Sequence, residues 1–130
     1  MNAGLDTSVT LRLLTGEPAA QAEAAHRLMA TVGPATISDL VVGETYFALR
    51  HHYGVPHAEA LRQLLELLED TRVVPSGMAP VVLREALAAR SSATAAGLID
   101  RLIRADYAMN GVEVFTFDRN VARLSGVRLV

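Results

Sequence analysis

Four acidic residues in this sequence have side chains suited to binding a metal ion: Asp6, Glu44, Asp100 and Asp118. Brought together with no lysine among them, these carboxylates would repel one another unless a cation were bound. Ligand sets made only of oxygen suit Mg²⁺ or Mn²⁺. Such ions activate a water molecule and stabilise the charge that develops on a phosphate under attack, so the set predicts hydrolysis of phosphodiesters.

Two of the four acids also have an ordinary structural explanation. Asp6 precedes Thr7-Ser8, and Asp118 precedes Arg119-Asn120. Both contexts suit the N-cap of a helix, where a carboxylate accepts hydrogen bonds from backbone N–H groups. Taken singly, each aspartate is better explained by a cap than by a site.

Glu44 is harder to explain structurally. In a helix over residues 40–53, its neighbours three and four positions away are Leu40, Val41, Phe47 and Ala48, which places it on the apolar face. A buried glutamate is costly unless it is paired or bound to a metal. We therefore expect either a site residue or one half of an ion pair, and we favour the site.

Asp100 lies beside an apolar helical stripe and has Arg104 one turn further on. A surface pair between these two residues is its structural explanation. Asp106 projects still closer to the same stripe. Helical geometry alone leaves the choice between Asp100 and Asp106 open.

Composition narrows the possible chemistry. The 130 residues suffice for one domain, and 51% are hydrophobic against 20% charged, a balance typical of a folded protein. The chain has no cysteine, which excludes disulfides and thiolate sites. It has no lysine either, which excludes a P-loop and Schiff-base chemistry. Without the four candidate ligands, ten acids remain against 12 arginines, and this net charge of +2 suits nucleic-acid phosphates.

Short apolar runs alternate with helical periods along the chain. We expect strands at residues 2–5, 35–37, 73–74, 112–117 and 127–130. We expect helices after residue 8 and at residues 18–29, 40–53, 56–69, 79–90, 96–109 and 118–124, with a loop at 91–95. This alternation predicts an α/β fold with a mostly parallel sheet covered by helices on both faces. Sites in such folds gather at the carboxyl ends of the strands.

Three segments together carry a resemblance to a known family: LDTSVTLRLL, ISDLVVGETYFALRHHYGV and IDRLIRADYAMNGVEVFTFDRNVARLSGVRLV. In their order and spacing, and in the TFDR element near the end, they resemble the PIN-domain ribonucleases. The likeness is greatest to the VapC-type toxins of prokaryotic type II toxin–antitoxin pairs. It spans nearly the whole chain and implies a single PIN-like domain over residues 1–130 with a three-layer α/β/α fold.

The resemblance also assigns roles to residues. It places the family's four acids on Asp6, Glu44, Asp100 and Asp118, and so selects Asp100 over Asp106. The hydroxyl residue of the family's TxD element falls on Thr116, which implies a group that supports the site.

The function implied is that of a Mg²⁺- or Mn²⁺-dependent endoribonuclease that leaves a 5′-phosphate and a 3′-hydroxyl. The expected partners are an RNA substrate, a cognate antitoxin and a second copy of the chain in a homodimer. One alternative is a phosphoryl-transfer protein with an acidic pocket, although such proteins ordinarily need a lysine. The other is a non-catalytic module that keeps the PIN fold and uses the pocket to bind a partner.

Three further features bear on partners and location. The leucine row Leu61, Leu64, Leu65 and Leu68 predicts a core face, part of which could meet a second copy or the antitoxin. His51, His52 and His57 are predicted to be surface residues, since no further ligand completes a zinc set. Without a basic leader or a long apolar segment, the chain is expected to be cytoplasmic and free of membrane contacts.

Overall fold

Three parallel strands form the sheet around which the protein is built. The computed structural model describes residues 3–89 and 95–130. Strands β1 (Ala3–Leu5), β2 (Ala35–Ile37) and β3 (Val73–Pro75) pair in the order β1-β2-β3, with Leu5 opposite Ile37 and Ile37 opposite Pro75. The carboxyl ends of all three strands therefore meet at one edge. The predicted α/β class with a parallel sheet is confirmed.

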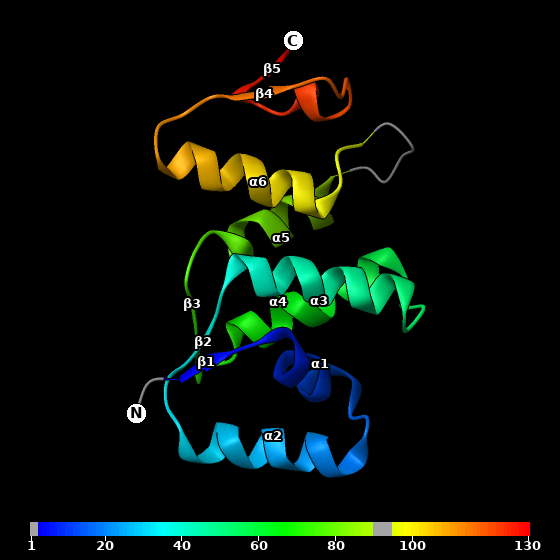
Figure 1. The fold of residues 1–130 in the computed structure, drawn as a ribbon, viewed down its shortest axis with the longest axis vertical. Helices are drawn as coiled ribbons and strands as arrows, with labels where there is room; N and C mark the ends of the chain where they lie inside the picture. Colours follow the sequence, from blue (N-terminus) through cyan, green and yellow to red (C-terminus); the bar gives the residue numbers. More distant parts are fainter. Residues whose placement is uncertain (1–2, 90–94) are drawn as a thin grey trace.

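Helices cover both sides of this sheet. They are α1 (Thr7–Thr15), α2 (Ala19–Thr31), α3 (Asp39–His51), α4 (His57–Glu69), α5 (Ala79–Ala88) and α6 (Leu98–Met109). In Figure 1, α2 lies on one side of the strands and the stack from α3 to α6 lies on the other, which gives three layers. Most predicted boundaries hold to within two or three residues; the predicted helix end at Arg90 and most of the loop at 91–95 lie outside the described residues.

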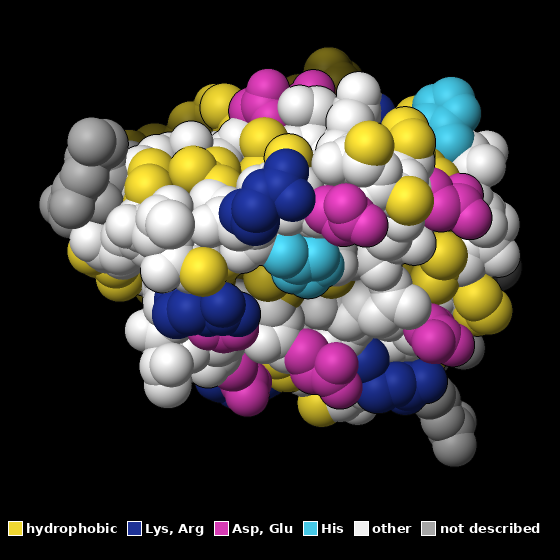
Figure 2. All heavy atoms as spheres, turned by 90° about the horizontal axis from the view of Figure 1, so that it is seen from below, with side chains coloured by type: hydrophobic (Ala, Val, Ile, Leu, Met, Phe, Trp, Pro, Cys, Tyr) yellow, Lys and Arg dark blue, Asp and Glu magenta, His cyan; other side chains and the backbone are white. Residues whose placement is uncertain are grey.

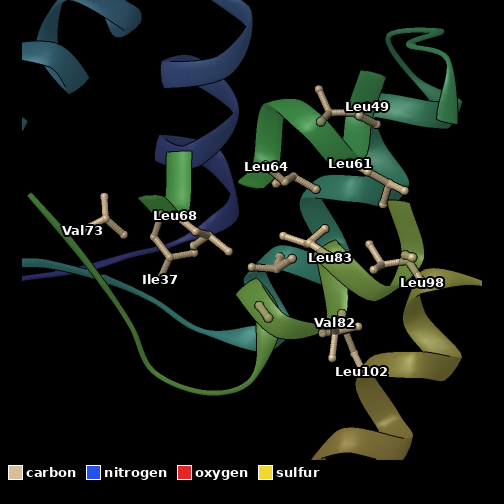
Figure 3. Close-up of a cluster of buried hydrophobic side chains, with 14 of the residues drawn as sticks. Ile37, Leu49, Leu61, Leu64, Leu68, Val73, Val82, Leu83, Leu98 and Leu102 are labelled. Atoms are coloured by element: carbon tan, nitrogen blue, oxygen red, sulfur yellow. The ribbon is translucent and has the colours of Figure 1, made fainter. Parts of the chain in front are cut away.

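The core lies between the sheet and the stack of helices. Leu61 and Leu64 of α4 are each 1% exposed, which confirms the predicted core face of that helix. Figure 3 shows these side chains meeting Leu83 of α5 and Leu98 of α6. Burial of such apolar surface is what holds α4, α5 and α6 in place.

The last two strands lie apart from this sheet. Strand β4 (Val114–Thr116), the short 3-10 helix η1 (Val121–Arg123) and strand β5 (Val127–Leu129) follow α6, and β4 pairs with β5 in a separate parallel two-stranded sheet. Figure 1 shows this unit beyond α6, on the far side from β1. In the turn that ends α6, the N–H of Val112 donates to the carbonyl of Tyr107 at 3.1 Å. The sequence pattern predicted both strands but not this separation.

Candidate active site

Asp6 stands at the carboxyl end of β1 and begins α1. Its Oδ1 accepts hydrogen bonds from the hydroxyl of Ser8 at 2.7 Å and from the N–H of Val9 at 3.1 Å. These bonds favour the ionised form, and the Ser8 hydroxyl is the main cause of a lowered pKa for Asp6. The cap explanation is thus confirmed for one oxygen. Among the described residues nothing donates to Oδ2, which remains open to a cation.

Glu44 lies next to this position, on the first half of α3. The hydroxyl of Thr7, the residue after Asp6, donates to Oε1 of Glu44 at 2.9 Å. Within the described part of the chain Glu44 forms no ion pair, so the ion-pair alternative finds no support there. The hydrogen bond brings two of the four predicted acids to one edge of the sheet.

The apolar face around Glu44 is not buried as the sequence suggested. Glu44 is exposed, and on either side of it Leu40 is 81% and Phe47 51% exposed. The physical reason is that α6 packs against α3 at Gly43, where a side chain would meet Leu102, and does not cover Leu40 and Phe47. Glu44 therefore bears little of the desolvation cost expected from its position in the helix.

An open groove of about 870 Å³ results between α3 and α6. Its lining combines three acidic side chains with apolar ones: Thr7, Asp39, Leu40, Gly43, Glu44, Phe47, Ala48, His52, Ile99, Leu102, Ile103, Asp106 and Tyr107. The groove thus runs from the start of α1, beside Asp6, along the length of α6.

The structure places Asp106, and not Asp100, on the wall of this groove. Asp100 lies in the first turn of α6 and is partly buried. The predicted surface pair between Asp100 and Arg104 does not form. Arg104 instead binds Glu85 of α5, with its Nη2 at 2.8 and 3.0 Å from the two carboxylate oxygens. Asp100 has no ion-pair partner among the residues that the structure describes.

Sequence reasoning missed the charged cluster to which Arg104 belongs. Glu85 also accepts a hydrogen bond from Nη1 of Arg101 at 2.7 Å, and Arg101 is only 8% exposed. The position of Arg101 in the sequence could have revealed this cluster, because this charged residue falls on the same face of the helix as the apolar stripe. This cluster fixes α6 against α5 and so positions one wall of the groove.

Asp118 and Thr116 lie with the separate β4–β5 sheet. Oδ1 of Asp118 accepts hydrogen bonds from the N–H groups of Asn120 at 2.8 Å and Val121 at 3.3 Å, the cap that its context suggested. The N–H of Asp118 donates to the Thr116 hydroxyl at 2.9 Å. Because α6 lies between this unit and β1 (Figure 1), one chain in this arrangement does not bring Asp118 to Asp6.

The donors present suit a divalent cation, but the set is incomplete within one described chain. Asp6 and Glu44 each offer one carboxylate oxygen without a described hydrogen-bond partner. Across residues 3–89 and 95–130, no three His, Cys, Asp or Glu side chains are grouped so as to hold a metal. Oxygen donors fit Mg²⁺ and Mn²⁺, while the number of donors falls short.

The histidines form no part of this arrangement except for His52, at the end of the groove. His51 and His52 are exposed, as predicted. The prediction of a surface position was wrong for His57, which is partly buried with its Nδ1 2.6 Å from the hydroxyl of Tyr46, and burial lowers the pKa of His57.

Nucleases of the family that the sequence resembles are expected to have a parallel α/β domain with carboxylates at the carboxyl edge of the sheet. This chain has two carboxylates there. The PIN domain model matches residues 4–127, so the chain belongs to the PIN domain family. PIN domains are generally nucleases and typically use divalent metal ions. A search of curated proteins found no match to the chain. No helix in the described residues is both long and apolar enough to cross a membrane.

Proposed function

We propose that the protein is a Mg²⁺- or Mn²⁺-dependent endoribonuclease that acts as the toxin of a toxin–antitoxin pair. The observation that carries this proposal is the pairing of Asp6 and Glu44 through Thr7 at the carboxyl edge of the sheet of a PIN domain. The nuclease class follows from the family. The choice of RNA, the metal and the toxin role rest on the sequence resemblance.

In this proposal Asp6 and Glu44 hold the cation, directly or through water, while the ligand roles of Asp100 and Asp118 rest on the sequence resemblance alone. When bound, the cation supplies an activated water and offsets the charge that develops on the scissile phosphate. The chain contributes the positioning: Ser8 and Val9 keep Asp6 ionised and oriented, and Thr7 fixes Glu44. Thr116 fixes the turn that presents Asp118.

Arginine side chains are the groups available to bind RNA. They outnumber the acids outside the candidate ligand set, and a guanidinium bonds phosphate through two parallel N–H groups. The face shown in Figure 2, on the side of α2, intersperses arginine with acidic side chains and gathers neither sign. This face therefore shows no concentration of arginine that would mark the path of the RNA.

The proposal that an antitoxin binds this protein rests on exposed apolar surface. Phe47 of α3 and Ile103 and Tyr107 of α6 are 51%, 45% and 47% exposed along the groove. Exposed apolar side chains that form a continuous strip indicate a surface that a protein partner covers. A partner bound there would also stand over Glu44.

Cleavage of a structured RNA by the purified protein tests the enzymatic part. We expect cleavage with Mg²⁺ or Mn²⁺, none in excess chelator, recovery when the metal is restored, and products with 5′-phosphate ends. Cleavage that persists in chelator would show that the metal dependence is wrong. A folded, metal-supplied protein that cleaves no RNA in a varied panel would contradict the ribonuclease assignment.

Growth of a bacterial host tests the toxin part separately. Expression of the chain alone should arrest growth, and expression of Asp6→Asn to the same level should not. Harmless expression of a folded protein that cleaves RNA in the test tube would refute the toxin role and leave the nuclease intact.

A further inference from the structure

Arg104 of α6 does not bind the carboxylate that its position in the helix favours. Asp100 lies one helical turn before it, at the spacing where an aspartate and an arginine face each other and pair. Helical side chains also lean toward the N-terminus of their helix, which directs a side chain at position 104 toward Asp100. Arg104 nevertheless binds Glu85 of α5, the helix beside α6 (Figure 1), with Nη2 at 2.8 and 3.0 Å from the two carboxylate oxygens. Asp100 is left without an ion pair or a side-chain hydrogen bond in the described part of the chain.

We propose that Glu85 is a positioning residue: by holding Arg104 against α5, it keeps the carboxylate of Asp100 unpaired and so available to a divalent cation. The diversion of Arg104 rests on the contacts of these side chains. The use of Asp100 by a cation rests on the proposed function, in which the sequence resemblance makes Asp100 a ligand. Glu85 is given no contact with cation or RNA, and it acts only through Arg104.

The charges around Glu85 are shielded from water, so each of them needs a partner. The side chain of Arg101 is 10% exposed and that of Arg104 19%. Glu85 accepts from Nη1 of Arg101 at 2.7 Å as well as from Arg104, so one carboxylate serves two guanidinium groups. A poorly solvated guanidinium that loses its carboxylate is strongly destabilising unless it finds another. For Arg104, the carboxylate at the favoured spacing on its own helix is that of Asp100.

The pairing of Arg104 with Glu85 also leaves one donor of Arg104 unused. Nε of Arg104 is buried and has no hydrogen-bond partner among the residues that the structure describes. A buried N–H without an acceptor is costly. A carboxylate that meets Nε and an Nη together, as in a two-pronged arginine–carboxylate pair, satisfies both donors. Arg104 released from Glu85 therefore gains by turning to Asp100.

Pairing with Arg104 would compete directly with a cation for Asp100. The carboxylate of Asp100 turns back toward the start of α6, since its Oδ2 would lie 3.8 Å from a Cβ built on Gly97. A guanidinium bonded to both oxygens occupies the lone pairs that a metal ion needs. It also places a positive charge beside the position of the cation. Loss of Glu85 should thus weaken cation binding although no ligand has changed.

Mn²⁺ binding measured by titration calorimetry tests this role through a rescue. Glu85→Gln keeps the size of the side chain and removes its charge, and it should bind Mn²⁺ about 10- to 100-fold more weakly than wild type. Arg104→Gln leaves Glu85 paired with Arg101 and should bind as wild type does. The double variant Glu85→Gln/Arg104→Gln should regain wild-type affinity, because the competitor of the cation is gone. If Glu85→Gln does not fold, Glu85→Asp, which keeps the charge but shortens the reach, replaces it in the same comparison.

A purely structural role for Glu85 predicts the opposite result for the double variant. Each substitution then removes a contact between α5 and α6, so the second one restores nothing. Wild-type affinity in Glu85→Gln, or a double variant as weak as Glu85→Gln, would therefore overturn the proposal. The matched control is Glu69→Gln, which breaks the exposed pair with Arg84 and should leave Mn²⁺ binding unchanged.

A double-mutant cycle in the free energy of unfolding tests the diversion of Arg104 without any metal. Asp100→Asn and Arg104→Gln should have additive effects in the wild-type background, because the two side chains do not pair there. In the Glu85→Gln background the same substitutions should be coupled, because the pair then forms. Additive effects in both backgrounds would refute the role of Glu85. If the coupling appears but wild type binds no Mn²⁺, the proposed metal-dependent function has failed, and the hold of Glu85 on Arg104 is supported.

Discussion

Capping and metal binding are compatible roles for the same aspartate. Asp6 and Asp118 each use Oδ1 to accept hydrogen bonds from the turn that follows. Those bonds set the direction of the carboxylate and leave its other oxygen open to the site. On sequence alone, the N-cap role offered a structural explanation for these two aspartates. The same role also orients each carboxylate for metal binding.

Asp6 should make the free energy of unfolding depend on pH. Its pKa is lower in the folded chain than the ordinary 3.8, so its stabilising contribution is complete above that value and is lost as the pH falls through the folded pKa. The difference in free energy of unfolding between wild type and Asp6→Ala should therefore be constant around neutral pH and shrink on acidification. Urea denaturation across pH measures this difference. A difference that grows in acid would show that the sign is wrong.

Glu85 should be the acidic side chain whose loss costs most stability. Glu85→Ala leaves Arg101 and Arg104 without their carboxylate in a poorly solvated position, and we expect a loss of about 3 kcal/mol. The control is Glu69→Ala, which breaks an exposed pair with Arg84 and should cost less than about 1 kcal/mol. Chemical denaturation measures the loss in free energy of unfolding for the two variants. Equal losses would contradict the role given to Glu85.

Asp39 joins α3 to α5, two helices that lie far apart in the sequence. Ser38 accepts the capping hydrogen bond of α3 from Val41. Asp39 reaches instead to the start of α5, where its two oxygens accept from the N–H groups of Met78 and Ala79, both at 3.1 Å. Nothing in the local sequence reveals this contact, because Asp39 and Met78 lie 39 residues apart.

Gly77→Ala should disrupt this junction. A Cβ at Gly77 would overlap Oδ2 of Asp39, so the carboxylate must move away from the N-terminus of α5. We expect a loss of about 1–3 kcal/mol in the free energy of unfolding. Gly4→Ala, with no described atom within 4 Å of the new Cβ, is the control and should be nearly neutral. Thermal or urea unfolding measures the stability of both variants. A Gly77→Ala protein as stable as wild type would show that the junction between Asp39 and α5 does not contribute to stability.

Local patterns predicted the elements well, and packing between distant elements decided what they missed. The strand at Ala35–Ile37 and the core leucines of α4 follow from apolar runs and helical period alone. The exposure of Glu44 depends on where α6 stops covering α3, and the position of Asp118 depends on the turn at Gly111. Neither is encoded in the periodicity of a single segment.

The whole molecule leaves two kinds of surface uncovered: the apolar groove between α3 and α6, and the open edges of the two sheets. The first suits a protein partner. It lies next to Glu44, so a partner bound there would stand over that carboxylate.

The proposed function makes Glu44, beside Asp6, a metal ligand. Glu44→Gln keeps an oxygen to accept the Thr7 hydrogen bond and removes a charge that repels Asp6. The melting temperature of the metal-free protein should therefore hold or rise. Stabilisation by Mn²⁺ should shrink, and RNA cleavage should fall by orders of magnitude.

The decisive measurement is thermal melting with and without Mn²⁺, run beside RNA cleavage, for wild type, Glu44→Gln and the control Glu66→Gln. Glu66 is an exposed glutamate of α4 outside the groove, and its variant should match wild type throughout. We expect a stable Glu44→Gln protein that has lost both its response to Mn²⁺ and its activity. A Glu44→Gln protein that melts early yet still cleaves RNA would contradict this expectation.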